Sequence, residues 1–123
     1  MAHILVIDDE PNYIKAIGRI LRLIGHTSQG AHNGQEALEL LKHKQFDLII
    51  SDTNMGTMDG PAFVRAFRLT DQVTPIVMNS GGGLQSEVQE LLKARALQYY
   101  VNKGILNEEW KEILLQFLPP ATP

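Results

Sequence analysis

Two patterns of apolar residues alternate along the chain. Short runs rich in Ile, Val and Leu, typical of buried strands, are followed by longer segments whose apolar residues recur every three or four positions, as on one face of a helix. The first pair is a strand from His3 to Ile7 and a helix whose apolar stripe extends from Tyr13 to Ile24. Gly25 follows this stripe, where a left-handed residue commonly ends a helix. The chain is therefore predicted to begin with one β-α unit.

The same pair of patterns recurs along the rest of the chain. Further strands are predicted around residues 26–31, 46–51, 74–78 and 97–101. Further helices are predicted after Asn33-Gly34, after the cap and first-turn signal Asp59-Gly60-Pro61, over residues 84–94 and over residues 108–118. Strict alternation of this kind implies an α/β fold in which parallel strands are joined by right-handed crossovers, with helices on both faces of the sheet.

Length and composition fit one folded domain. The chain has 123 residues, of which 44% are hydrophobic and 20% are charged, and these values are close to those of ordinary globular proteins. We expect the domain to span residues 3–118 and to be followed by a proline-rich tail, or the start of a linker, at residues 119–123.

Charge and residue usage argue against several classes of function. The net charge is -3 and no segment is densely basic, so direct binding to nucleic acid is not expected. The absence of cysteine excludes disulfides, thiolate nucleophiles and Cys-based zinc sites. The apolar run from Ile4 to Ile7 is too short for a signal peptide or a membrane helix, so we expect a cytoplasmic protein without a membrane partner.

Polar side chains follow four of the predicted strands. These strand ends are Asp8-Asp9-Glu10, Ser51-Asp52, Asn79-Ser80 and Asn102-Lys103. The carboxyl ends of parallel strands form one edge of a sheet, and ligands bind in the crevice beyond that edge. We therefore expect these side chains to form one site.

The acidic side chains in this group predict a bound divalent cation. Asp8, Asp9 and Asp52 would repel one another at the ends of neighbouring strands unless a cation lay among them. Oxygen ligands without Cys or paired His favour a hard cation such as Mg²⁺.

The group as a whole predicts phosphoryl transfer. Lys103 would add a positive charge and Ser80 a hydroxyl donor, and with a cation these groups can neutralise the oxygens of a transferring phosphoryl group. Asp52 is the best candidate for the nucleophile because it ends a strand expected to be central, and Asp8 and Asp9 are then the metal ligands. Acidic residues at strand ends can also serve only as helix caps, but capping does not require a lysine and a hydroxyl in the same place.

The order and spacing of these motifs match a known family over essentially the whole chain. The matching segments are Val6-Ile7-Asp8-Asp9-Glu10, Asp47-Leu48-Ile49-Ile50-Ser51-Asp52 continuing to Met55 and Met58-Asp59-Gly60, Pro75-Ile76-Val77-Met78-Asn79-Ser80, and Tyr100-Val101-Asn102-Lys103. Together they resemble the receiver domain of two-component response regulators, here of the single-domain type. The resemblance implies a flavodoxin-like, doubly wound sheet of five parallel strands in the order 2-1-3-4-5, with five helices.

The resemblance also implies the roles of site residues. Asp52 would be the phosphoacceptor, and Mg²⁺ would be held by Asp8, Asp9, Asp52 and the backbone carbonyl of Asn54. Lys103 would pair with the phosphoryl group.

Two residues would carry the conformational switch that the resemblance implies. Ser80 would move toward the phosphoryl group, and Tyr100 would rotate between outward and inward positions as Ser80 shifts. The alternative for Tyr100 is an ordinary half-buried strand aromatic.

The partners expected from the resemblance are proteins. The phosphoryl group would come from a histidine kinase, a phosphotransfer protein or a small phosphodonor. Because the sequence contains no output domain, the signal should pass to a protein that binds the face formed by the fourth helix, fifth strand and fifth helix. The chain would phosphorylate and dephosphorylate only itself, so it would not otherwise be an enzyme.

Several glycines depart from the family pattern. Gly104 follows Lys103 where the family usually has proline, often with a cis bond; a cis non-proline bond costs about 2.5 to 4 kcal/mol, so we expect a trans or mobile loop. Gly56 replaces another common proline, and Gly81-Gly82-Gly83 follows Ser80 where bulkier residues are usual. These glycines should let water reach an acyl phosphate easily and shorten the life of the phosphorylated state.

Two other functions remain open from the sequence. The Gly56 and Gly104 departures fit a receiver-like module that binds partners without phosphorylation. A hydrolase of the haloacid dehalogenase type also uses a strand-end aspartate with Mg²⁺, but Asn54 stands where such enzymes have a second aspartate, and the chain is short for a cap domain.

Overall fold

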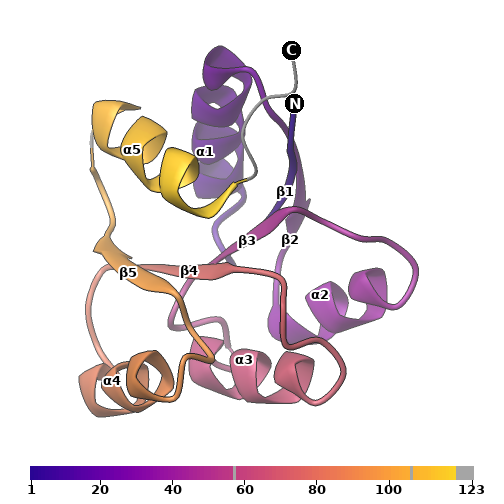
Figure 1. Ribbon diagram of the computed structural model, residues 1–123, viewed down its shortest axis with the longest axis vertical. Helices are drawn as coiled ribbons and strands as arrows, with labels where there is room; N and C mark the ends of the chain where they lie inside the picture. The colour runs from indigo at the N-terminus through magenta and orange to yellow at the C-terminus, as the bar shows by residue number, and fades with distance from the viewer. Residues whose placement is uncertain (57, 106, 119–123) are drawn as a thin grey trace.

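The structure is a computed structural model, and it describes residues 1–56, 58–105 and 107–118 (Figure 1). One parallel sheet has the strand order β2-β1-β3-β4-β5, and its strands alternate with helices along the chain. The strands are β1 (His3–Ile7), β2 (Thr27–Ala31), β3 (Leu48–Ser51), β4 (Ile76–Ser80) and β5 (Tyr99–Asn102). The helices are α1 (Pro11–Ile24), α2 (Gly34–Leu41), α3 (Gly60–Arg68), α4 (Gln85–Lys93) and α5 (Asn107–Phe117). The predicted α/β fold and strand order are confirmed.

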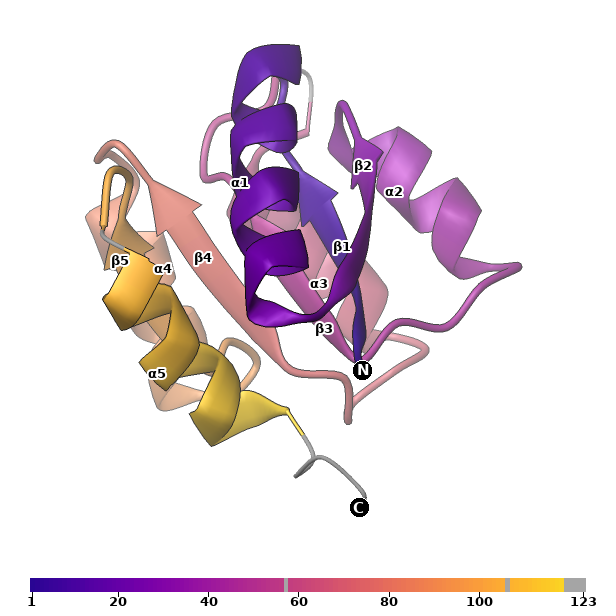
Figure 2. The same ribbon diagram turned by 90° about the horizontal axis from the view of Figure 1, so that it is seen from above.

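Helices cover both faces of the sheet. Helices α1 and α5 lie on one face, and α2, α3 and α4 lie on the other (Figures 1 and 2). The alternation of side chains along β1 shows why: Ile4 and Val6 pack with α1 and α5, whereas Leu5 and Ile7 pack with the three helices opposite. A sheet buried on both faces explains the continuous apolar runs in the sequence.

The predicted end signals act at the helix termini. Gly25 ends α1 in the left-handed region at φ 103°. The side chain of Asp59 accepts a hydrogen bond of 2.8 Å from the backbone N–H of Ala62 and so caps α3. Asn33 was expected only to mark a turn, but its side chain caps α2 in the same way. It accepts a hydrogen bond of 2.7 Å from the backbone N–H of Glu36.

Strands β4 and β5 begin two residues later than predicted. The prediction began β4 at Thr74, but Pro75 has no N–H to donate to a strand ladder, and the strand begins at Ile76. Leu97 resembles a strand residue because it is apolar and buried, yet its N–H donates to the carbonyl of Leu91 in the turn that ends α4. Strand β4 also ends two residues later than predicted, at Ser80, so its carboxyl end includes polar positions.

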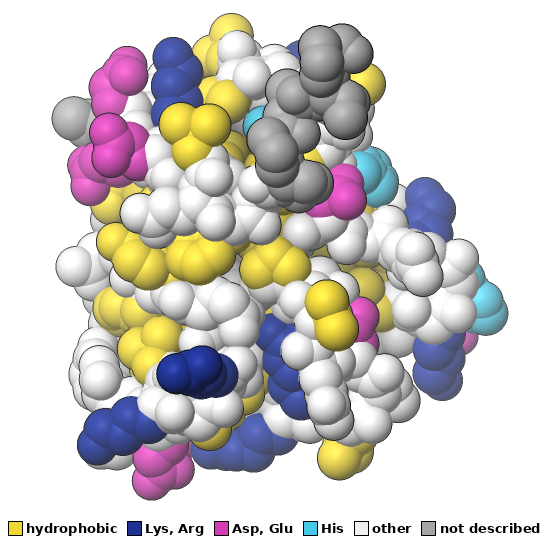
Figure 3. Space-filling view, viewed as in Figure 1, with side chains coloured by type: hydrophobic (Ala, Val, Ile, Leu, Met, Phe, Trp, Pro, Cys, Tyr) yellow, Lys and Arg dark blue, Asp and Glu magenta, His cyan; other side chains and the backbone are white. Residues whose placement is uncertain are grey.

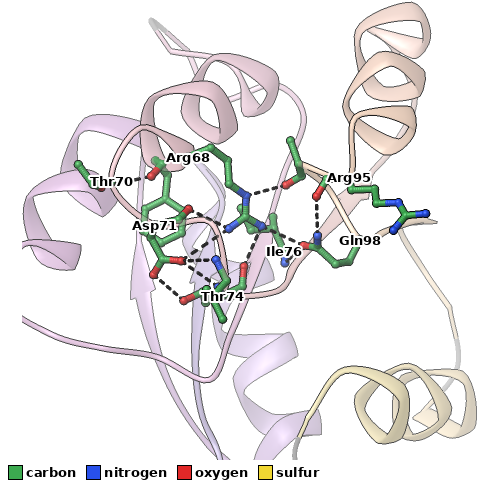
Figure 4. Close-up of polar contacts among 10 residues, drawn as sticks. Arg68, Thr70, Asp71, Thr74, Ile76, Arg95 and Gln98 are labelled. Atoms are coloured by element: carbon green, nitrogen blue, oxygen red, sulfur yellow. Dashed lines mark hydrogen bonds and ion pairs between the residues drawn. The ribbon is translucent and has the colours of Figure 1, made fainter.

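A hydrogen-bonded network centred on Arg68 closes the amino-terminal edge of β4 and β5 (Figure 4). The guanidinium of Arg68 donates at 2.8–3.1 Å to the carbonyls of Asp71, Thr74 and Ala96 and to Oε1 of Gln98. The same oxygen of Gln98 accepts from the N–H of Ile76 at 2.8 Å. One arginine thus joins the end of α3 to the loops that precede β4 and β5.

The described elements lie within the predicted domain, from β1 to α5. The predicted tail at residues 119–123 lies outside the described residues. In the described ranges, no helix is both long enough and apolar enough to cross a bilayer.

Candidate functional site

The carboxyl-terminal edge of the sheet brings three carboxylates together. Asp8 follows β1 and Asp52 follows β3, and these are adjacent strands in which Ile7 lies opposite Ser51. The strand arrowheads in Figure 2 point to this edge, in the upper part of the picture. Asp8, Asp9 and Asp52 each offer an oxygen within 4.8 Å of one another. The predicted convergence of the acidic strand ends is therefore present.

Burial differs among the three carboxylates. Asp8 is 2% exposed and Asp52 is 7% exposed, whereas Asp9 is exposed. Oδ1 of Asp8 accepts from the N–H of Glu10 at 2.9 Å, and Oδ1 of Asp52 accepts from the N–H of Thr53 at 2.8 Å. The two buried carboxylates are thus held by the backbone, and Asp9 lies toward solvent.

Lys103 places one positive charge in this group. Its Nζ lies 2.8 Å from Oδ2 of Asp8 and 3.5 Å from Oδ2 of Asp52. The backbone N–H of Lys103 donates to the carbonyl of Ser80 at 2.8 Å, which ties the residue after β5 to the end of β4. The ammonium group of Lys103 thus contacts two of the strand-end carboxylates, and its expected pairing with a phosphoryl group stays a prediction.

The electrostatics of the site are unbalanced. Burial raises the pKa of Asp52, and the charge of Asp8 raises it further, against the opposing effects of Lys103 and the N–H of Thr53. Burial acts to lower the pKa of Lys103, but its contacts with Asp8 and Asp52 outweigh burial and raise it. The raised pKa of Lys103 thus reflects the carboxylates around it, whereas that of Asp52 reflects first its burial and then the nearby charge of Asp8.

This donor set fits a hard divalent cation. The ligand atoms are carboxylate oxygens, the local charge is negative, and the exposed Asp9 leaves a solvent side for the waters that Mg²⁺ retains. Asn54 follows Asp52 in the same loop and is exposed, and the ligand role expected of its backbone carbonyl stays a prediction.

The hydroxyl of Ser80 is engaged with the loop that follows β4. Ser80 is fully buried, and its Oγ donates to the carbonyl of Gly82 at 3.1 Å and accepts from the N–H of Gly82 at 3.0 Å. The predicted movement of Ser80 toward Asp52 would require both hydrogen bonds to break.

Tyr100 is half-buried against the core on the α2, α3 and α4 side of the sheet. Its hydroxyl accepts a hydrogen bond of 3.0 Å from Nε2 of Gln85, the first residue of α4. The loop from Ser80 leads directly to Gln85. Ser80 is therefore linked to Tyr100 through this loop and the hydrogen bond from Gln85.

The glycines around the site take conformations suited to glycine. Gly82, Gly83 and Gly104 have φ of 123°, 95° and 90°. No cis peptide bond occurs among the described residues, so the expected trans bond after Lys103 is confirmed.

Sequence reasoning missed the part that Tyr13 plays at this edge, and it placed Asn79 here only as a polar strand end. The sequence placed Tyr13 only in the apolar stripe of the first helix, but its ring centroid lies 4.4 Å from Nζ of Lys103. The buried amide Nδ2 of Asn79 donates a hydrogen bond to the hydroxyl of Tyr13. A usable signal was the position of Tyr13 in the first turn after Asp8-Asp9, because helical side chains point back toward the amino terminus.

Two buried polar atoms near the site have no hydrogen-bond partner within the described part of the chain. They are Oγ1 of Thr53 and Oδ1 of Asn79. Buried polar atoms are usually paired, so this edge retains unused hydrogen-bonding capacity.

A family model described as the response regulator receiver domain matches residues 4–114. The transcriptional regulatory protein ZraR of Salmonella typhimurium is 32% identical over 98 residues, which cover 80% of this chain and 22% of ZraR. The signal transduction histidine-protein kinase BarA of Escherichia coli is 30% identical over 121 residues, which cover 94% of this chain and 13% of BarA. The chain thus spans less than a quarter of the length of these curated relatives.

Solved structures of similar size match almost the whole chain. The chemotaxis protein CheY4 of Vibrio cholerae matches with a TM-score of 0.86 and 32% identity, covering 96% of this chain and 99% of that one. The response regulator protein TrrA of Thermotoga maritima, solved in complex with Mg(2+)-BeF, matches with a TM-score of 0.84 and 30% identity, covering 96% of this chain and 100% of that one.

Proposed function

Because the chain belongs to the response regulator receiver domain family of two-component systems, we propose that it is a signalling switch that accepts a phosphoryl group on Asp52. The observation that carries this proposal is the position of Asp52 after the central strand β3, where the ammonium group of Lys103 contacts both its carboxylate and that of Asp8. We assign this domain to residues 3–118 and residues 119–123 to a tail or linker.

Asp52 would act as the nucleophile. One carboxylate oxygen of Asp52 attacks the phosphorus of a phosphohistidine or of acetyl phosphate, and a new O–P bond forms while the bond to the leaving group breaks. The leaving nitrogen or oxygen takes the electron pair. Lys103, 3.5 Å from Oδ2 of Asp52, is placed to offset the charge on the phosphoryl oxygens. In self-dephosphorylation, water attacks the phosphorus, the O–P bond to Asp52 breaks, and inorganic phosphate leaves.

Mg²⁺ would be held by Asp8, Asp9, Asp52 and the backbone carbonyl of Asn54. When bound, it would supply positive charge toward the oxygens of the phosphoryl group. The negative excess of the Asp8, Asp9 and Asp52 group supports this assignment. TrrA, 30% identical and solved with Mg(2+)-BeF, supports it independently.

The switch would begin at Ser80. A phosphoryl group on Asp52 would compete with Gly82 for the Ser80 hydroxyl, and the loss of two hydrogen bonds would free the loop that leads to α4. Gln85 at the start of α4 bonds to Tyr100, so this repacking would change the environment of Tyr100. The result would be a population shift between two packings of α4 and β5.

The expected partners are a histidine kinase or phosphotransfer protein as donor and a protein target on the face formed by α4, β5 and α5. Figure 3 shows acidic side chains beside basic ones over α5, mostly basic side chains over helices on the other side of the sheet, and a hydrophobic band between them.

The proposed function is tested by intact mass measurement after incubation with acetyl phosphate and Mg²⁺. We expect a phosphoryl adduct that is absent in EDTA and absent in Asp52→Asn. Asp47→Asn, which changes an exposed aspartate before β3, serves as the matched control and should retain the adduct. A folded wild-type protein that forms no adduct and does not consume the donor would leave the phosphorylation-independent binding module as the function.

A further inference from the structure

The ring of Tyr13 contacts the ammonium group that the proposed function depends on. Tyr13 lies in the first turn of α1, and its ring centroid is 4.4 Å from Nζ of Lys103. This distance is within the range of a cation–π interaction, in which the negative face of the ring attracts a positive group. The proposed chemistry uses Lys103 but assigns nothing to Tyr13.

The ring itself is held from the sheet. Nδ2 of Asn79 donates to the hydroxyl of Tyr13, and Asn79 is 1% exposed within β4. Tyr13 also packs against the core between the sheet and the α1 and α5 layer. The ring is therefore fixed by one hydrogen bond at its tip and by packing along its body.

The residue after Lys103 gives it no steric support. Gly104 has φ 90°, and a Cβ at this position would meet nothing within 4 Å. A lysine side chain carries about 2 kcal/mol of rotamer entropy, so its position depends on the contacts that it makes. The backbone hydrogen bond from Lys103 to Ser80 fixes the main chain only, so the position of the side chain depends on the contacts of its ammonium group.

The contacts of the ammonium group differ in how they respond to the reaction. Its two carboxylate contacts, with Asp8 and Asp52, involve groups that a cation or a phosphoryl group would also engage. The ring of Tyr13 is uncharged and takes no part in those exchanges. It offers Lys103 a contact that persists when the charges of the site change.

We propose that Tyr13 is a positioning residue for Lys103, with its ring holding the ammonium group over the carboxylates and Asn79 holding the ring. This proposal rests on the proposed function, because the task of Lys103 is phosphoryl transfer to Asp52. A cation–π contact of this kind corresponds to about a threefold to thirtyfold effect on the population of the productive lysine position.

The first test compares the rate of adduct formation in Tyr13→Leu and Tyr13→Phe, with acetyl phosphate below saturation and Mg²⁺ in excess. Tyr13→Leu removes the ring and should slow the rate about threefold to thirtyfold. Tyr13→Phe keeps the ring and should remain within about twofold of wild type. Equal rates in the wild type and Tyr13→Leu would overturn the proposal, as would a Phe variant as slow as the Leu variant. Tyr13→Met replaces Tyr13→Leu if thermal unfolding shows that the Leu variant does not fold.

A double-mutant cycle separates positioning from a general structural effect. If Tyr13 acts through Lys103, Tyr13→Leu should have an effect of less than about twofold in a Lys103→Ala background. The same fold-change in both backgrounds would contradict the proposal, because Tyr13 would then act without Lys103.

A spectroscopic readout does not depend on phosphorylation. The ring should shift the NMR resonances of the Lys103 ε-methylene upfield in the wild type and in Tyr13→Phe, and the shift should vanish in Tyr13→Leu. If the wild type forms no adduct, the proposed function fails while this shift still decides whether the ring holds Lys103. An unshifted methylene in the wild type would refute the positioning role even if the adduct forms.

Discussion

The two ends of β4 and β5 carry polar clusters of opposite character. At the amino-terminal edge, one guanidinium is matched by four acceptors, and the network around Arg68 is hydrogen-bonded throughout (Figure 4). At the carboxyl-terminal edge, one ammonium group faces three carboxylates, and two nearby buried polar atoms lack a partner among the described residues.

This difference suggests that the amino-terminal edge stabilises the fold, whereas the carboxyl-terminal edge is the candidate site for chemistry. A satisfied polar network fixes the elements that it joins, whereas a network with an excess of carboxylates has remaining affinity for a cation. The loops follow the same division: a hydrogen-bonded arginine supports the amino-terminal edge, while glycines of positive φ surround the carboxyl-terminal edge. The fold thus holds the starts of β4 and β5 while their other ends adjoin the loops that are expected to change.

The largest expected effect is on stability at the amino-terminal edge. Arg68→Met should lower the free energy of unfolding by about 3 kcal/mol, because it leaves several acceptors without a donor. Urea unfolding measures this loss. The rate of adduct formation on Asp52, measured well below the unfolding midpoint, should remain within about twofold of wild type.

Arg65→Met provides the matched control, since Arg65 is an exposed arginine in the same helix. It should change the free energy of unfolding by less than about 0.5 kcal/mol. A phosphorylation rate that falls together with stability in Arg68→Met would mean that the two edges are not separable.

At the carboxyl-terminal edge, a substitution that abolishes phosphorylation should increase the free energy of unfolding. Burial and the charge of Asp8 raise the pKa of Asp52, so the folded state disfavours its ionised form near neutral pH. In EDTA, Asp52→Asn should raise the free energy of unfolding by about 1 kcal/mol while abolishing the adduct. Asp9→Asn, at the exposed member of the group, should have a smaller effect. A less stable Asp52→Asn protein would show that the Lys103 contact outweighs the repulsion.

The third prediction concerns the lifetime of the phosphorylated state. Gly82 has φ 123°, so a bulky residue there would strain the backbone, but Gly81 has no such requirement and a Cβ there would meet nothing within 4 Å. Gly81→Phe should slow loss of the phosphoryl group by about threefold, an effect of less than 1 kcal/mol, by shielding it from water. Intact mass over time measures the decay. An unchanged lifetime would show that this loop does not admit the attacking water.

The smallest expected effect is the pH dependence of Asp71 at the amino-terminal edge. Burial acts to raise the pKa of Asp71, but hydrogen bonds from Thr74 and Val73 outweigh burial and lower it. The ionised carboxylate therefore adds stability above about pH 4, and this stability is lost as pH falls through the lowered pKa. Asp71→Asn should cost less than about 1 kcal/mol near neutral pH, because an amide oxygen can accept the same N–H groups.

Urea unfolding between pH 7 and pH 2.5 tests this assignment. The difference between the wild type and Asp71→Asn should shrink as the solution becomes more acidic. A difference that stays constant over this range would mean that the charge of Asp71 adds nothing beyond its hydrogen bonds.

The linear sequence determined the elements and the main parts of the site. Periodicity placed the strands and helices, Gly25 and Asp59 marked helix ends, and the polar strand ends placed Asp8, Asp52 and Lys103 at one edge. These inferences succeed because the spacing of apolar residues is a local property of the chain. Once the strands are known to be parallel, their carboxyl ends must lie at the same edge of the sheet. The starts of β4 and β5 were misplaced where buried apolar residues and a proline adjoin a strand.

Only the tertiary structure decided which distant side chains meet. Tyr13 reaches Lys103 because α1 and β5 are brought together around the end of β4, and Arg68 meets Gln98 because the end of α3 lies beside the turn after α4. Such contacts depend on the rotation of each helix about its axis and on how it crosses the sheet. Those geometries arise from packing among many residues at once, and no local pattern in the sequence encodes them.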